Sequence, residues 1–99
     1  MARLVVTVRA ARDVAAIVAM LTDNAGADVA MRYRRNIDTL YDRLSLFPRS
    51  GARRPSLGRD IRIGTIDPYV VIYEYRPDTV RVLRVIDGRR NVTRRLVRE

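Results

Sequence analysis

The residues of this chain that could take part in chemistry are arginines, carboxylates and tyrosines. Its 99 residues include 20 basic and 11 acidic side chains, all of the basic ones are arginine, and histidine and cysteine are absent. Proton transfer near neutral pH is usually done by His, Cys, Tyr or a perturbed Asp, Glu or Lys, whereas arginine stays protonated. The planar guanidinium instead grips phosphate or carboxylate groups. The net charge of +9 therefore favours binding over catalysis without excluding an enzyme, and we assign no catalytic residue, metal or cofactor.

Arginine is most concentrated near the C-terminal end of the sequence. We predict a target-binding surface there, formed by Arg84, Arg89, Arg90, Arg94 and Arg95. Such a surface suits an acidic protein partner or a nucleic acid backbone, and phosphate contacts would make the binding strongly salt-dependent. A solvated basic face with no specific partner is the third interpretation. Because the tyrosines fall in apolar strand patterns, a base-stacking platform for single-stranded nucleic acid is not favoured.

A second set of arginines interrupts otherwise apolar strands: Arg62, Arg81 and Arg84. Each can point to solvent or pair with a nearby carboxylate. Alternatively, the set lines a basic, partly apolar groove that suits an acidic amphipathic segment. The aspartates of this region fall at predicted turns and strand ends, where aspartate is common, so they do not indicate a metal site. They are Asp60, Asp67, Asp78 and Asp87.

The elements that must position these side chains lie in residues 61–90, which have the pattern of a three-stranded antiparallel meander. The strands are rich in β-branched and aromatic residues, and the turns between them are too short for a parallel crossover. We expect them at residues 61–65, 69–75 and 80–86. The last strand carries apolar residues on both faces, which places it with 69–75 in the middle of the sheet. Strict alternation puts Val80, Val82 and Ile86 on one face and Leu83 and Val85 on the other.

The N-terminal half begins with a short strand and a first helix. Residues 4–8 (LVVTV) are typical of an edge strand. A helix is expected over about residues 11–24, with no clear N-cap and with Asp13 in its first turn. Gly26 suits the break that follows, because glycine accepts a positive φ. The apolar stripe of this helix is Val14, Ile17, Val18 and Leu21.

The second helix is expected over residues 28–47, with Asp28 as its N-cap. Its apolar residues recur at spacings of four and three: Tyr33, Ile37, Leu40, Leu44 and Phe47. The two helices, joined by a few residues, should form an antiparallel hairpin on one face of the sheet. Residues 89–99 form a basic tail, either frayed or docked as a short helix through Val92, Leu96 and Val97. The chain is thus predicted to be one α+β domain, residues 1–99.

Three sequence words resemble the RelE/ParE superfamily of type II toxins: LFPRSG at residues 46–51, PYVVIYEY at 68–75 and VRVLRVIDGRR at 80–90. The resemblance implies a strand, a helical hairpin and a three-stranded meander. RelE-like members cut messenger RNA on the ribosome with lysines, arginines and often a C-terminal tyrosine. This chain has no lysine, no tyrosine after Tyr75, and Val70 where those toxins tend to carry an arginine. It therefore resembles the ParE-like branch, known as inhibitors of DNA gyrase, although Asp87 replaces a histidine that many relatives carry.

The resemblance implies two protein partners. A ParD-like antitoxin would dock through a segment that is disordered until bound, against a groove that includes Arg62, Arg81, Tyr73 and Tyr75. DNA gyrase would be bound by the C-terminal arginines. Two alternatives stay open: an inactive family member that serves as an interaction module, or a RelE-like, ribosome-dependent mRNA endonuclease that uses Arg89, Arg90 and Arg62. With no long apolar run and no secretion signal, we expect a cytoplasmic protein without a membrane segment.

Overall fold

The computed structural model describes residues 1–98, so Glu99 of the predicted tail lies outside the described residues. The elements follow the predicted α+β order of strand, helical hairpin and meander. They are β1 (Arg3–Val6), α1 (Val8–Ala25), α2 (Ala27–Leu46), β2 (Ala52–Arg53), the 3-10 turn η1 (Pro55–Leu57), β3 (Ile61–Ile66), β4 (Tyr69–Arg76), β5 (Thr79–Asp87) and α3 (Arg94–Val97).

The strands form one five-stranded sheet in the order β1-β5-β4-β3-β2. β1 pairs in parallel with β5 at one edge, and the other neighbours are antiparallel. The parallel return is allowed because the helical hairpin and the meander separate the two strands in the sequence. β4 and β5 lie inside the sheet, as predicted. The two-residue strand β2 was not predicted, since two residues carry no recognisable alternation.

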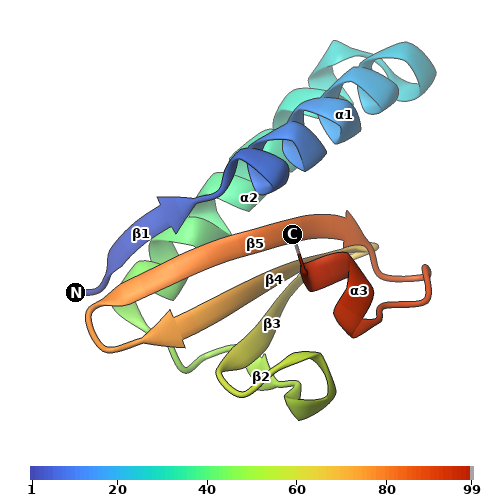
Figure 1. Ribbon diagram of the computed structural model, residues 1–99. Coiled ribbons are helices and arrows are strands. Elements are labelled where there is room, and N and C mark those ends of the chain that lie inside the picture. The colour runs from blue at the N-terminus through green and yellow to red at the C-terminus, as the bar shows by residue number, and fades with distance from the viewer. Residues whose placement is uncertain (99) are drawn as a thin grey trace.

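The two faces of the sheet are covered very unequally. The α1–α2 hairpin lies behind the sheet and extends past one end of it, whereas the short α3 lies in front (Figure 1). Tyrosines and valines of β4 and β5 pack against the hairpin in the main core. A smaller cluster on the opposite face is covered by the C-terminal segment, and consists of Leu57, Ile61, Ile63, Ile72, Leu83 and Ile86 with partly buried Val92, Leu96 and Val97.

Because of a register shift between β4 and β5, the residues on each face of β5 differ from the prediction. Pairing is interrupted between Ile72 and Tyr73, and Leu83 is the extra residue on the opposite strand. A β-bulge of this kind reverses the alternation beyond it. Val85 therefore faces the hairpin and Ile86 faces α3, the reverse of the prediction, because an extra residue leaves no mark on the sequence pattern.

The starts of both helices also differ from the prediction. α1 begins at residue 8 rather than 11, because the hydroxyl of Thr7 accepts the N–H of Ala10 at 3.1 Å and caps the helix. The strand before it is correspondingly shorter, and Asp13 lies beyond the first turn. Gly26, at a φ of 95°, separates the helices as expected. It also occupies the N-cap of α2, so Asp28 lies in the first turn instead.

The apolar stripe of α2 is confirmed over most of its length. Ile37, Leu40 and Leu44 are buried against the sheet. Phe47 is 63% exposed, contrary to the prediction, because the helix ends at residue 46 and the C-cap residue leaves the helical spacing. Tyr41 was not predicted but is buried in the same core. The hairpin is thus fixed to the sheet through the second half of α2.

Candidate functional site

Arg84, which was predicted to contact a target, instead forms an ion pair with Asp13 inside the fold. Its Nε donates to Asp13 Oδ2 at 2.7 Å and its Nη2 donates to Asp13 Oδ1 at 3.0 Å. The side chains are 12% and 16% exposed. Hydrogen bonding to the aspartate raises the pKa of Arg84 above its ordinary value. Since the guanidinium is enclosed and already paired, Arg84 is withdrawn from the predicted target-binding surface.

The same contact joins three elements that are distant in the sequence. Asp13 Oδ2 also accepts the backbone N–H of Val85 at 3.0 Å. Arg84 Nη1 donates to the carbonyl of Leu96 at 2.9 Å. The pair therefore links α1 to β5 and to α3, and it positions the helix that carries two of the other predicted arginines.

Arg89 is held by the residue that ends β5. Its Nη2 lies 2.5 Å from Asp87 Oδ2, and its Nε and its backbone N–H both donate to Asp87 Oδ1 at 2.9 Å. This pairing lowers the pKa of Asp87 to about 2. The Arg89 side chain is nevertheless 79% exposed. Asp87 therefore orients an exposed arginine at the end of β5.

The other three predicted arginines lie on the surface around the end of β5 and on α3. Arg90, Arg94 and Arg95 are all exposed. The tail that carries them is docked rather than frayed, because Leu96 and its apolar neighbours pack on the smaller core cluster. Together with Arg89, they form an exposed basic surface, which we call the C-terminal arginine surface.

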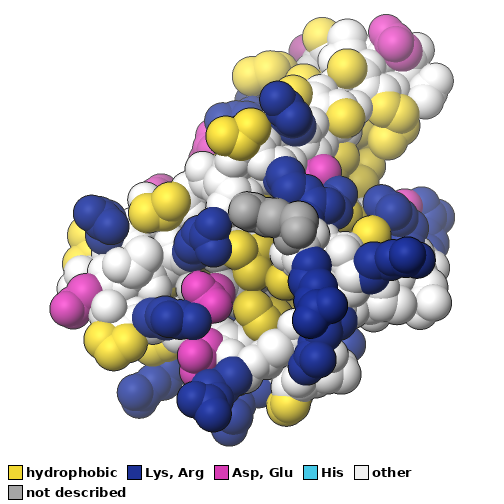
Figure 2. All heavy atoms as spheres, viewed as in Figure 1, with side chains coloured by type: hydrophobic (Ala, Val, Ile, Leu, Met, Phe, Trp, Pro, Cys, Tyr) yellow, Lys and Arg dark blue, Asp and Glu magenta, His cyan; other side chains and the backbone are white. Residues whose placement is uncertain are grey.

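Arg81 and Tyr75 line a hollow of about 710 Å³ on the α3 side of the sheet, here called the sheet groove. Figure 2 shows hydrophobic side chains at its floor and arginines at its rim. The apolar lining comes from η1, β3, β5 and α3 through Leu57, Ile61, Leu83 and Val97. The groove thus combines an apolar floor with charged walls, but of the arginines predicted to line such a groove (Arg62, Arg81 and Arg84) only Arg81 does so.

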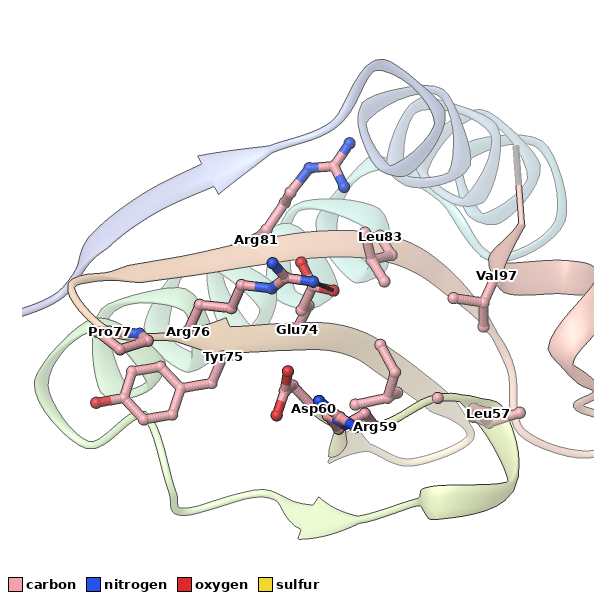
Figure 3. Close-up of a pocket in the computed structure, with 12 residues that line it drawn as sticks. Leu57, Arg59, Asp60, Glu74, Tyr75, Arg76, Pro77, Arg81, Leu83 and Val97 are labelled. Atoms are coloured by element: carbon pink, nitrogen blue, oxygen red, sulfur yellow. Dashed lines mark hydrogen bonds and ion pairs between the residues drawn. The ribbon is translucent and has the colours of Figure 1, made fainter.

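The walls of the sheet groove carry both signs of charge. Figure 3 shows the carboxylates of Asp60, just before β3, and Glu74, on β4. Arg76 Nη2 lies 3.4 Å from Glu74 Oε2, in an exposed ion pair between two residues of β4. Arg59 and Arg76 were not predicted. Arg59 lies just before β3, and Arg76 is the last residue of β4. Their position next to the ends of the predicted strands is the feature of the sequence that could have identified them.

Two members of the predicted antitoxin-binding set lie elsewhere. Tyr73 has no exposed surface, because its ring is in the core under the hairpin, and its hydroxyl donates to the carbonyl of Pro48 at 2.8 Å. It is therefore withdrawn as a partner contact. Arg62 donates to the carbonyls of Gly51 at 2.8 Å and Arg49 at 3.2 Å, outside the groove lining. Of the predicted set, the structure brings only Arg81 and Tyr75 together in the sheet groove.

Comparison with known proteins agrees with this architecture. A family model described as the ParE toxin of the type II toxin-antitoxin system, parDE, matches residues 4–92. The chain belongs to the ParE toxin family. The sequence-based assignment to the ParE-like branch of the RelE/ParE superfamily is therefore confirmed. The family match begins inside β1, runs through β5 of this ParE-type toxin and ends before α3.

Two relatives of this ParE-type toxin are informative. Toxin ParE3 of Caulobacter vibrioides is 35% identical over 74 residues, which cover 75% of this chain and 74% of the relative. A solved structure described as the chromosomal ParDE TA system from P. aeruginosa superposes with a TM-score of 0.75 at 25% identity, covering 88% of this chain and 96% of the other. The protein is accordingly a toxin component of a type II toxin–antitoxin system.

The described part of this toxin contains neither a membrane-spanning helix nor a cluster of metal ligands. Within residues 1–98, none of the helices has the length and apolar character needed to cross a bilayer. Over the same range, no three His, Cys, Asp or Glu side chains lie close enough together to hold a metal ion.

Proposed function

We propose that this toxin arrests growth in the bacterial cytoplasm by binding DNA gyrase, and not by cleaving a substrate. The supporting observation is that the perturbed carboxyl and tyrosine groups have pKa values that are shifted further from neutral pH. The pKa of Asp87 is lowered to about 2 by Arg89, and burial raises the pKa of Tyr41 to about 12. General acid–base catalysis needs a group that titrates near the working pH. The sequence adds no histidine, cysteine or lysine that could serve instead.

The surface that would contact gyrase is the C-terminal arginine surface. Its guanidinium groups are exposed and are carried by a docked segment, so little ordering is required on binding. Arginine is enriched at protein interfaces because its fork pairs with carboxylates. Arg90, Arg94 and Arg95 are the members that no acidic neighbour orients within the described residues.

A supercoiling assay with the purified chain tests this proposal. We expect loss of gyrase supercoiling at near-stoichiometric toxin, and recovery of supercoiling with an Arg90→Gln, Arg94→Gln, Arg95→Gln variant. An Arg12→Gln, Arg32→Gln, Arg35→Gln variant removes the same charge from the helices and should stay inhibitory. Unaffected supercoiling at stoichiometric excess would refute gyrase as the target, and specific mRNA cleavage in a translating extract would replace binding with nuclease activity.

We further propose that a ParD-like antitoxin neutralises the toxin by laying an acidic amphipathic segment in the sheet groove. The apolar floor would take the aliphatic side chains of such a segment, and Arg81 and Arg59 at the rim would pair with its carboxylates. Tyr75 would add a partly buried aromatic contact at one end. The related P. aeruginosa structure is described as a ParDE system, which supports an antitoxin as the partner.

Titration calorimetry with the product of the neighbouring reading frame tests the antitoxin site. Arg81→Glu and Tyr75→Ala should each weaken the complex by about tenfold or more, which corresponds to about 1.4 kcal/mol. Arg12→Glu makes the same charge reversal on the exposed face of α1 and serves as the control. Equal affinities for the three variants and the wild-type chain would place the antitoxin elsewhere.

A further inference from the structure

Residues 49–62 carry five arginines, most of which neither proposed protein contact uses. Four of them surround a second hollow, of about 470 Å³, beside the sheet groove: Arg49, Arg53, Arg59 and Arg62. We call it the arginine hollow. Within residues 1–98, no ion pair joins Arg49, Arg53 or Arg59 to a carboxylate.

The loop that carries this charge is held in place by hydrogen bonds. The hydroxyl of Tyr73 donates to the carbonyl of Pro48 at 2.8 Å and accepts the N–H of Gly51 at 3.0 Å. Arg62 Nη1 donates to the carbonyls of Gly51 and Arg49 at 2.8 and 3.2 Å. A Cβ at Gly51 would lie 2.5 Å from the Tyr73 hydroxyl, so the loop approaches the core as closely as glycine allows. These contacts fix the backbone at Arg49 and Gly51, directly before β2, which carries Arg53.

The lining of the arginine hollow differs from that of the sheet groove. Four arginines face two aspartates, Asp60 and Asp78, which leaves two positive charges in excess. The apolar lining comes from Ile61, Tyr75 and Pro77. A peptide partner anchors through apolar side chains in an apolar pocket, which the floor of the sheet groove provides. The arginine hollow instead presents guanidinium forks, which suit phosphate oxygens.

We propose that the arginine hollow binds the phosphodiester backbone of a nucleic acid. Arg49, Arg53 and Arg59 contact phosphate oxygens, and Arg62 supports the loop that presents the first two of them. Contacts of this kind carry no base sequence information, so the binding is independent of sequence. This site goes beyond the proposed function, because it requires neither gyrase nor an antitoxin.

Fluorescence anisotropy with the full chain and short labelled probes tests the site. The probes are a DNA duplex, single-stranded DNA and RNA of one sequence, and a polyglutamate peptide. The variant is Arg49→Gln, Arg53→Gln, Arg59→Gln, and the control is Arg12→Gln, Arg32→Gln, Arg35→Gln, which removes equal charge from exposed helix positions. Circular dichroism on both verifies that the fold is retained.

The wild-type chain and the control should bind nucleic acid with similar affinity, and the hollow variant should bind about tenfold more weakly or worse. Each phosphate contact adds about 0.9 to the salt slope on duplex DNA and about 0.7 on single strands, so the variant should lower the slope by about 2 to 3. Tighter binding of one nucleic acid probe than of the others identifies whether the natural ligand is duplex DNA, single-stranded DNA or RNA. Absence of binding, equal losses in both variants, or tighter binding of polyglutamate would each overturn the proposal.

Discussion

Replacing Asp13 with alanine should destabilise this small protein severely. The carboxylate accepts three hydrogen bonds, two from Arg84 and one from the N–H of Val85. Its loss leaves a guanidinium that is 12% exposed without its partner. Removing one partner of a fully buried pair costs about 3–5 kcal/mol, and an unsatisfied N–H adds about 1–3 kcal/mol. Because water reaches part of this site, we expect a loss of about 3 kcal/mol.

Urea unfolding followed by circular dichroism measures this loss. For a domain of this size, about 3 kcal/mol lowers the melting temperature by roughly 12 to 24 °C. Asp38→Ala is the matched control, because Asp38 pairs with Arg34 at 3.5 Å on the exposed face of α2. An exposed pair of this kind contributes about 0.5 kcal/mol or less. Both variants place alanine in a helix interior, so the gain in helix propensity of about 0.5 kcal/mol cancels between them.

The result that would refute this reasoning is a small difference between the two variants. If Asp13→Ala loses no more than about 1 kcal/mol beyond Asp38→Ala, the buried pair does not brace the fold. A double-mutant cycle with Arg84→Met separates the pair from the N–H of Val85. The cycle should give a coupling energy of about 1 kcal/mol or more between the two side chains.

Three further predictions concern the loop after α2, the end of β5 and the C-terminal tail. Tyr73→Phe should cost about 1–2 kcal/mol in urea unfolding, because the buried N–H of Gly51 loses its acceptor. The pKa of Asp87, about 2 in the folded protein, should return toward the ordinary aspartate value in Arg89→Ala, as followed by NMR titration. Since the folded pKa is the lower one, the stabilisation by this pair is present above the ordinary aspartate pKa and is lost as the pH falls toward 2. Truncation after Arg90 should uncover the smaller core cluster, seen as dye binding and a lower melting temperature, and an unchanged transition would contradict the docking of α3.

Sequence patterns predicted most of the fold because its elements are long and regular. The spacing of Ile37, Leu40 and Leu44 located α2, and the dense β-branched runs located β4 and β5. The faces of β5 beyond Leu83 could not be predicted, because a bulge adds a residue without altering composition. The start of α1 was missed although Thr7 is a good cap, since it stands inside an apolar β-branched run.

The candidate site was less predictable because its contacts join distant residues. Arg84 was assigned to an exposed surface, and its partner Asp13 lies 71 residues earlier in the sequence. Tyr73 and Tyr75 lie on the same face of β4, yet only the ring of Tyr73 is completely buried. Charge density did locate the exposed arginines of the C-terminal segment. Composition shows how many charged side chains the chain has, whereas burial and ion pairing decide which of them can contact a partner.

The outer edge of β5 is sealed against strand pairing between molecules. β1 covers this edge only as far as Val82. Beyond it, the hydroxyl of Thr7 donates to the carbonyl of Leu83 at 3.2 Å, and Asp13 takes the N–H of Val85. Open strand edges act as templates for aggregation. Side chains of Thr7 and α1 therefore occupy part of the β5 edge that a longer β1 would have covered.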